Sequence, residues 1–213
     1  MRVMKVEGIG ELKVLPNQVH ISFTIIYEDK DYKVVTSTIN QKQSKLLTIL
    51  NEIGIKSEEI KTVNYNVHNN YKNVLVANEQ KREHIGYKAI LTMLLKVPFD
   101  NELLEKVLKG ASRDEINAEI DIKFTTSDRE NKKAELLSKA VENAKQKAKV
   151  LAHASSVVLG DIVEVNYGAK AYNFYSNTNI APRALMASAD GIGQFTPEEI
   201  TLSESVNIVW EIK

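Results

Sequence analysis

The fold class is decided by residues 116–125, which read INAEIDIKFT. Apolar and polar residues alternate strictly along this stretch, and only a β-strand with one buried face turns a period of two into a single apolar surface. The next residues, 127–155, read SDRENKKAELLSKAVENAKQKAKVLAHAS. There the apolar period lengthens to three or four residues, which is typical of an amphipathic helix. A one-sided strand beside a long helix indicates a sheet covered by helices on one face.

The long helix is expected to begin with a capping box. Ser127 and Glu130 have the spacing at which each side chain satisfies an unpaired backbone N–H of the first turn. The inner stripe of this helix uses small residues repeatedly, and small residues let a helix lie close to a neighbouring element. The expected stripe consists of Ala134, Leu137, Val141, Ala144, Ala148, Leu151 and Ser155.

The same periodicities place the remaining elements. Strands at about 3–14 and 19–25 are expected to form a hairpin through the turn residues 15–18, with Gly8 and Gly10 as bulge or close-contact points. A helix is expected from Asp31 to Ile53, ended by Gly54 as a left-handed C-cap. Four more strands, an exposed polar loop and a short helix complete the prediction: strands near 63–71, 84–97, 162–167 and 200–212, the loop from Lys72 to Glu83, and the helix from Pro98 to Gly110.

These elements predict an α+β fold, in which a largely antiparallel or mixed sheet of about seven strands has helices packed on one face. Helices occur too rarely along the chain for a doubly wound parallel sheet. At about 150 residues per domain, 213 residues favour a single domain over 1–213 with one long loop at about 168–197.

Composition excludes several classes of protein. Lys and Arg together number 28, as do Asp and Glu, so no overall positive charge draws the chain to nucleic acid or an anionic membrane. The absence of cysteine excludes disulfides, thiolate metal sites and cysteine nucleophiles. The start of the chain has no signal-peptide pattern, and no apolar run approaches the length of a membrane span. We therefore expect a cytoplasmic protein as the sequence stands, and a periplasmic or cell-surface one if a leader has been removed.

The sequence offers no catalytic or cofactor pattern. Of the four histidines, none has the helical spacing of a metal-ligand pair, and no dinucleotide, P-loop or nucleophile-elbow motif is present. Glu119 and Asp121 share one face of a strand, but their alternation with polar neighbours is typical of a water-facing surface. The lysines of the long helix are interpreted as a solvated face rather than a nucleic-acid site. We therefore expect a protein that is not an enzyme and that needs no metal and no cofactor.

The long connection at about 168–197 is the most unusual segment, because ordinary connections have roughly 2–6 residues and longer ones are generally functional or disordered. Aromatic residues and Met are favoured in the cores of interfaces. The candidate interaction residues are therefore Tyr172, Phe174, Tyr175, Leu185 and Met186. Two interpretations stay open, a flap folded over the protein's own sheet edge and an arm that binds a partner.

An ordered set of short motifs covers nearly the whole chain. It comprises Gly8-Ile9-Gly10, Pro16-Asn17, Asn40, Gly54-Ile55, Glu59-Ile60-Lys61-Thr62, Tyr71, Gly86-Tyr87, Phe124, Ser127-Asp128, the helix carrying Ala140, Ala144, Ala148 and Ala152, and Leu159-Gly160. In this order the set resembles the SIMPL-domain family, a bacterial domain of unknown function that includes periplasmic and outer-membrane-associated immunogens. The resemblance implies an α+β fold, no established catalytic residues, and a stress- or envelope-related role. The sequence departs from the family where Asn17 follows the proline in place of the more usual Asp, and in having no export signal.

Three functional hypotheses follow, of which the third is nucleic-acid binding along the lysines of the long helix. The leading one is a non-enzymatic homo-oligomer, a scaffold or protein-interaction module that associates through sheet edges and the 168–197 segment. The alternative is a small-molecule-binding protein or an unrecognised hydrolase with a pocket under that segment.

Overall fold

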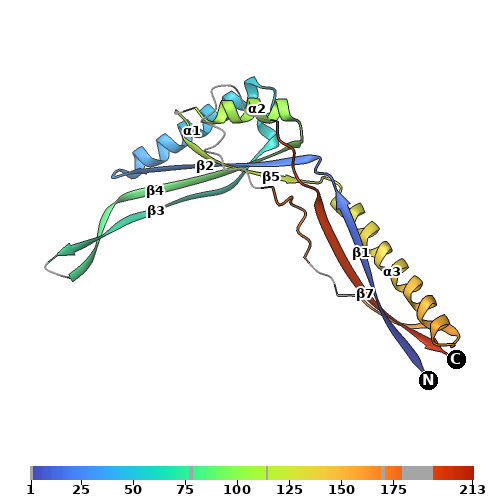
Figure 1. Cartoon of the computed structure of the whole chain (residues 1–213). Helices are drawn as coiled ribbons and strands as arrows, with labels where there is room; N and C mark the ends of the chain where they lie inside the picture. Colours follow the sequence, from blue (N-terminus) through green and yellow to red (C-terminus); the bar gives the residue numbers. More distant parts are fainter. Residues whose placement is uncertain (1, 77–78, 114, 169–170, 179–193) are drawn as a thin grey trace. The chain divides into compact units, whose positions relative to one another are not determined.

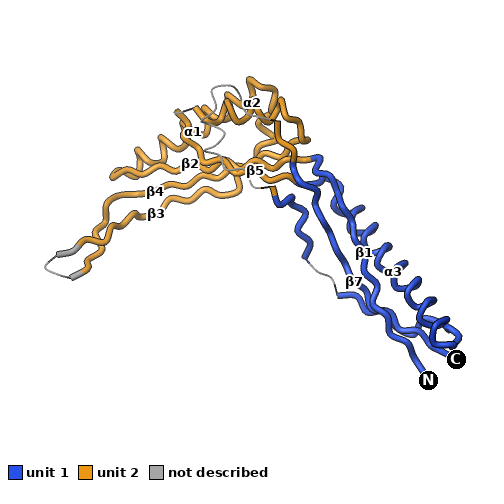
Figure 2. The backbone as a smooth tube through the Cα atoms, viewed as in Figure 1, with its two compact units in different colours: residues 1–17, 125–177, 197–213 blue, residues 18–124, 178–196 orange. Residues whose placement is uncertain are grey.

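The computed structural model describes residues 2–76, 79–113, 115–168, 171–178 and 194–213. Two compact units are present, and they are coloured separately in Figure 2: unit 1 contains 1–17, 125–177 and 197–213, and unit 2 contains 18–124 and 178–196. The single domain expected over 1–213 stays a prediction. Figure 1 shows the elements in chain order: β1 (Val3–Val14), β2 (Gln18–Asp29), α1 (Tyr32–Glu52), a 3-10 turn (Ser57–Glu59), β3 (Ile60–Val76), β4 (Glu79–Pro98), α2 (Asn101–Ala111), β5 (Ala118–Thr125), α3 (Arg129–Ala154), β6 (Leu159–Asn166) and β7 (Ile200–Ile212).

Unit 1 is a three-stranded antiparallel sheet, in the order β1-β7-β6, with α3 lying along one face of β1 and β7. Strict alternation along β7 turns one row of side chains toward the helix and leaves the other row toward solvent. The helix lies very close to β1: a Cβ added to Gly8 would be 2.0 Å from the carbonyl oxygen of Ala140, and one added to Gly10 would be 2.3 Å from that of Leu136. The predicted close contacts at both glycines are therefore confirmed.

The buried stripe predicted for α3 is wrong in part, and its predicted capping box is wrong. Ala144 and Ala148 are buried as predicted, but the rest of the stripe consists of Leu136, Ala140 and Ala152, whereas Leu151 is 46% exposed. The helix starts after Asp128 without a capping box, because the amide N–H of Ser127 donates to Asn17 Oδ1 at 2.9 Å and the Ser127 hydroxyl lies 3.3 Å from the same oxygen. Asn17, more than a hundred positions away in sequence, thus binds the residue just before the helix, and the expected local cap is not formed.

Unit 2 is a four-stranded sheet in the order β3-β4-β2-β5, packed against α1, which in turn contacts α2. Its core is formed by the inward rows of the strands and by the apolar faces of α1 and α2. The predicted end of α1 is confirmed: Gly54 has φ +94°, and the Ile55 N–H donates to the Leu50 carbonyl at 3.0 Å.

The predicted fold class is confirmed, since helices pack against antiparallel sheets made of seven strands. The predicted hairpin between residues 3–14 and 19–25 is wrong, because β1 pairs with β7 and β2 pairs with β4 in a different sheet. The predicted loop from Lys72 to Glu83 is also wrong, since β3 and β4 continue pairing to Val76 and Glu79. The described side chains of this extension are mostly solvent-exposed, so the segment has no buried face to give it a period of two.

Candidate functional site

The strongest candidate site lies in unit 1, where the first turn of α3 faces the segment that follows β6. An open pocket of about 460 Å³ is found there. It is lined by Arg129, Glu130, Lys133, Tyr167, Ala171, Tyr172 and Phe174. The pocket thus combines two cationic side chains from the helix with three aromatic rings from the segment.

Arg129 is held in one orientation by its own unit. Its Nη2 donates to Thr125 Oγ1 at 2.9 Å, and its Nε lies 3.4 Å from the Thr126 carbonyl. The guanidinium carbon is 5.2 Å from the ring centroid of Tyr175 and 5.8 Å from that of Phe174, within the range of cation–π attraction. No carboxylate among the described residues forms a salt bridge with Arg129. The other N–H groups of the planar fork are therefore free to take a ligand.

Lys133 carries the second positive charge. Its Nζ pairs with Glu130 Oε1 at 2.7 Å and lies 5.9 Å from the centroid of the Phe174 ring. The Glu130 side chain is 85% exposed, so its pairing with Lys133 is largely screened by solvent. Since Arg129 and Lys133 outnumber Glu130, the described lining carries a net positive charge.

The lining tyrosines contact Glu204, a carboxylate that is only 1% exposed. Its Oε2 accepts a short hydrogen bond from the Tyr172 hydroxyl and a weaker one from Tyr167 at 3.4 Å, and its Oε1 accepts from the Ser205 N–H at 2.8 Å. Burial, followed by the hydrogen bond to Glu204, raises the pKa of Tyr172 far above its usual range. Tyr172 therefore keeps its proton at all ordinary pH values and is unsuited to act as a general base.

Sequence reasoning missed Glu204, although a signal was present. The inward row of β7 reads Ile200, Leu202, Glu204, Val206, Ile208 and Trp210. One charged residue interrupts an otherwise apolar row. A buried carboxylate needs hydrogen-bond donors, so this interruption predicts polar partners nearby.

The structure brings together three of the five predicted interaction residues. Phe174 is 4% exposed and packs with Leu12, Val14, Leu136, Ile200 and Leu202. Tyr172 lies beside it with ring centroids 5.7 Å apart, and Tyr175 forms a bridge with Thr125. Leu185 and Met186 lie outside the described residues. Around 172–175, the segment thus lies against its own unit, and its role as an interaction site stays a prediction.

β1 and β6 are the edge strands of the unit 1 sheet, and they differ in how their backbones are covered. On β1, the Ile9 N–H donates to Asn143 Oδ1 at 3.0 Å, and the Glu7 carbonyl accepts from Lys147 Nζ at 3.1 Å, so side chains of α3 cover that edge. On β6, Ile162, Val163 and Val165 are 45–53% exposed. Among the described residues, no side chain caps the backbone of β6 in the same way.

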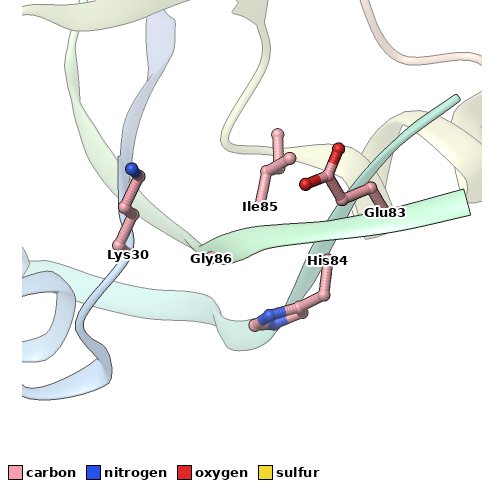
Figure 3. A pocket seen from close by; sticks show the side chains of 5 residues that line it. All are labelled: Lys30, Glu83, His84, Ile85 and Gly86. Carbon is pink, nitrogen blue, oxygen red and sulfur yellow. The ribbon is translucent and has the colours of Figure 1, made fainter. Parts of the chain in front are cut away.

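A second pocket of about 390 Å³ lies in unit 2, at the base of the β3–β4 hairpin, and is lined by Lys30, Glu83, His84, Ile85 and Gly86. Figure 3 shows Glu83 and Ile85 on one side of β4 and the His84 ring on the other. His84 lies between the rings of Tyr71 and Tyr87, with centroids 5.4 and 5.3 Å away. Because the polar groups diverge, this pocket is a weaker candidate for a ligand site.

Other classes of site receive little support. In the described parts of the chain, no three His, Asp or Glu side chains come together as a metal site would require. None of the helices that the structure describes is both long and apolar enough to cross a membrane. On α3, Lys132 and Lys139 both pair with Glu135, at 2.9 and 3.6 Å, which neutralises part of the lysine-rich face.

A family model described as SIMPL, protein of unknown function (DUF541), matches residues 4–210. The chain belongs to the SIMPL family. The resemblance expected from the short motifs is thereby confirmed, and the family's function is not known.

Relatives are distant but extend over nearly the whole chain. The 26 kDa periplasmic immunogenic protein of Brucella melitensis is 25% identical over 212 residues, which cover 98% of this chain and 84% of that protein. The uncharacterized protein YggE of Edwardsiella ictaluri is 21% identical over 206 residues, which cover 96% and 84%. Among solved structures, the regulatory subunit of aspartate kinase from Thermus flavus aligns at 10% identity with a TM-score of 0.22, over 97% of this chain and 89% of that one. A TM-score this low gives no evidence of a shared fold.

Proposed function

We propose that this SIMPL-family protein is a non-enzymatic interaction module that self-associates by pairing the β6 edges of two copies. The observation that carries this proposal is the difference between the two edges of one sheet. α3 caps the backbone of β1, whereas β6 exposes three β-branched apolar side chains. An uncovered edge strand is a template for pairing with another chain.

The sequence of β6 suits pairing with itself. In an antiparallel, two-fold arrangement centred between Val163 and Glu164, Ile162 is opposite Val165 of the second copy. Asp161 is then opposite Asn166 of the second copy, and no two carboxylates face each other. Register shifts on both sides of Ile162 twist the strand, and a twisted edge strand pairs less well with another chain. The association is therefore expected to depend on concentration.

Light scattering across protein concentration tests this proposal. The full chain is expected to approach a multiple of 23.9 kDa as concentration rises. Val165→Lys places a charge in the proposed contact and is expected to shift the mass toward the monomer. Val150→Lys is a matched control, because Val150 is 67% exposed and belongs to α3 rather than to β6. A wild-type monomer at all concentrations, or a Val165→Lys variant that associates as strongly as wild type, would refute the proposal.

A second candidate function, small-molecule binding, is supported by the pocket at Arg129. A volume of about 460 Å³ lies within the roughly 300–1,000 Å³ of ordinary ligand sites. The observation that favours this candidate is a fixed guanidinium that has no carboxylate partner in the part of the chain that the structure describes. Tyr172 offers hydrolysis no general base, because burial and the hydrogen bond to Glu204 raise its pKa and keep the hydroxyl protonated.

The relatives support a periplasmic location over the cytoplasmic one. The two Brucella relatives are named periplasmic immunogenic proteins and match 98% of this chain. Fractionation of cells that express the natural gene, with detection by antibody, tests this part. Recovery with the cytoplasmic fraction alone would contradict it.

A further inference from the structure

We infer that the pocket at Arg129 binds a small carboxylate with an apolar body. This inference rests on the second candidate function, ligand binding, and adds the chemical class of the ligand. It requires a cation that is fixed in place, an apolar wall beside it and enough room for both parts of the ligand. The described residues supply all three.

Arg129 supplies the fixed cation. Thr125 and Thr126 hold one side of the guanidinium, and the rings of Phe174 and Tyr175 lie beside it. A fork whose orientation is already set loses little conformational freedom when it binds, and its planar geometry matches the two oxygens of a carboxylate. Because Arg129 has no acidic partner among the described residues, a bound carboxylate does not have to displace one.

The two acidic side chains near the pocket both have partners of their own among the described residues. Glu130 is 85% exposed and already pairs with Lys133. Glu204 is buried, and its oxygens accept hydrogen bonds from Tyr167, Tyr172 and the Ser205 N–H. Among the charged groups that line the pocket, Arg129 is therefore the one with hydrogen-bond donors left for a ligand.

The aromatic lining supplies the apolar wall. Tyr172 directs its hydroxyl to Glu204, so its ring rather than its polar end is available to the pocket. Ala171 and the partly exposed Tyr167 extend this surface. Burying apolar surface against such a wall adds free energy that a carboxylate alone cannot gain.

NMR titration of the ¹⁵N-labelled full chain with three probes tests the inference. Benzoate has both a carboxylate and an apolar ring, acetate lacks the ring, and benzyl alcohol lacks the charge. Benzoate is expected to shift the amide signals of the pocket residues saturably, and with an affinity about tenfold above that of either other probe, as expected for loss of one charge-assisted pair or most of the ring contact.

Two variants localise the effect. Arg129→Gln is expected to weaken benzoate binding about tenfold. Lys132→Gln removes a neighbouring charge of the same helix that does not line the pocket, and its benzoate affinity is expected to match wild type. If Arg129→Gln fails to fold, Arg129→Lys keeps the charge, loses the fork, and is expected to weaken benzoate binding several-fold.

The possible results separate this inference from the pocket function on which it rests. Benzyl alcohol binding as tightly as benzoate would overturn the carboxylate preference and leave the ligand pocket standing. Acetate binding as tightly as benzoate would overturn the inference that the ligand has an apolar body. Arg129→Gln with wild-type affinity would overturn the role of the guanidinium. Failure of all three probes to bind would overturn both the inference and the candidate function.

Discussion

Replacing Gly8 by alanine tests the close approach of α3 to β1. The new Cβ would lie 2.0 Å from the carbonyl oxygen of Ala140 and 2.6 Å from the Cβ of Ala144. Both neighbours belong to the helix and are not the ends of flexible side chains, so α3 must move away by roughly 1 Å to restore ordinary contact distances. Inserting one methyl group into a packed core typically costs about 1–3 kcal/mol, and a backbone clash places this change near about 3 kcal/mol.

Urea denaturation followed by tryptophan fluorescence measures the loss in the free energy of unfolding with a probe in the affected core. Trp210 is the chain's single tryptophan, and it is buried in the same cluster as Val6, Ala140 and Ala144. Gly168→Ala is the control, because a Cβ at Gly168 meets nothing within 4 Å. The reasoning is refuted if Gly8→Ala lowers the free energy of unfolding no more than the control does.

Two further predictions concern single hydrogen bonds in unit 1. Tyr172→Phe removes a donor to the buried Glu204, and we expect the free energy of unfolding to fall by about 1–3 kcal/mol at neutral pH in urea titrations. Because the folded pKa of Tyr172 is raised above the unfolded value of 10.0, its contribution is fully present below pH 10 and is lost as the pH rises above that value. Wild type should therefore lose more stability between pH 8 and 11 than Tyr172→Phe does, and equal losses would contradict the assignment. Asn17→Ala removes the acceptor for the Ser127 N–H, and thermal unfolding should show a loss of about 1 kcal/mol; an unchanged midpoint would contradict this role.

Several elements were predictable because their information is local. α1 ends at Gly54 as expected, since a glycine in the left-handed region followed by an apolar residue is readable from sequence alone. The strict alternation of β5 and β7 was also readable, because each has one buried and one exposed face. The extended part of the β3–β4 hairpin was not, since its described side chains are mostly exposed on both faces.

The candidate site was predictable only in part. The aromatic residues of a long connection predicted Tyr172 and Phe174 as interaction residues, and the structure places both against the sheet of unit 1. Arg129 was not predicted as a site residue, because nothing local indicates that Thr125 and Tyr175 hold it. The orientation of its guanidinium depends on residues that the chain brings together from separate elements.

By itself, the sequence determined the fold class and the family, because both rest on periodicity and on short motifs in a fixed order. Tertiary structure alone decided that β1 pairs with β7, at the other end of the chain, rather than with β2. It also decided which face of α3 is buried: a stripe of alanines at every fourth position fits against Gly8 and Gly10. The physical reason is that strand pairing and helix approach depend on the shape of the opposing surface, which no local pattern contains.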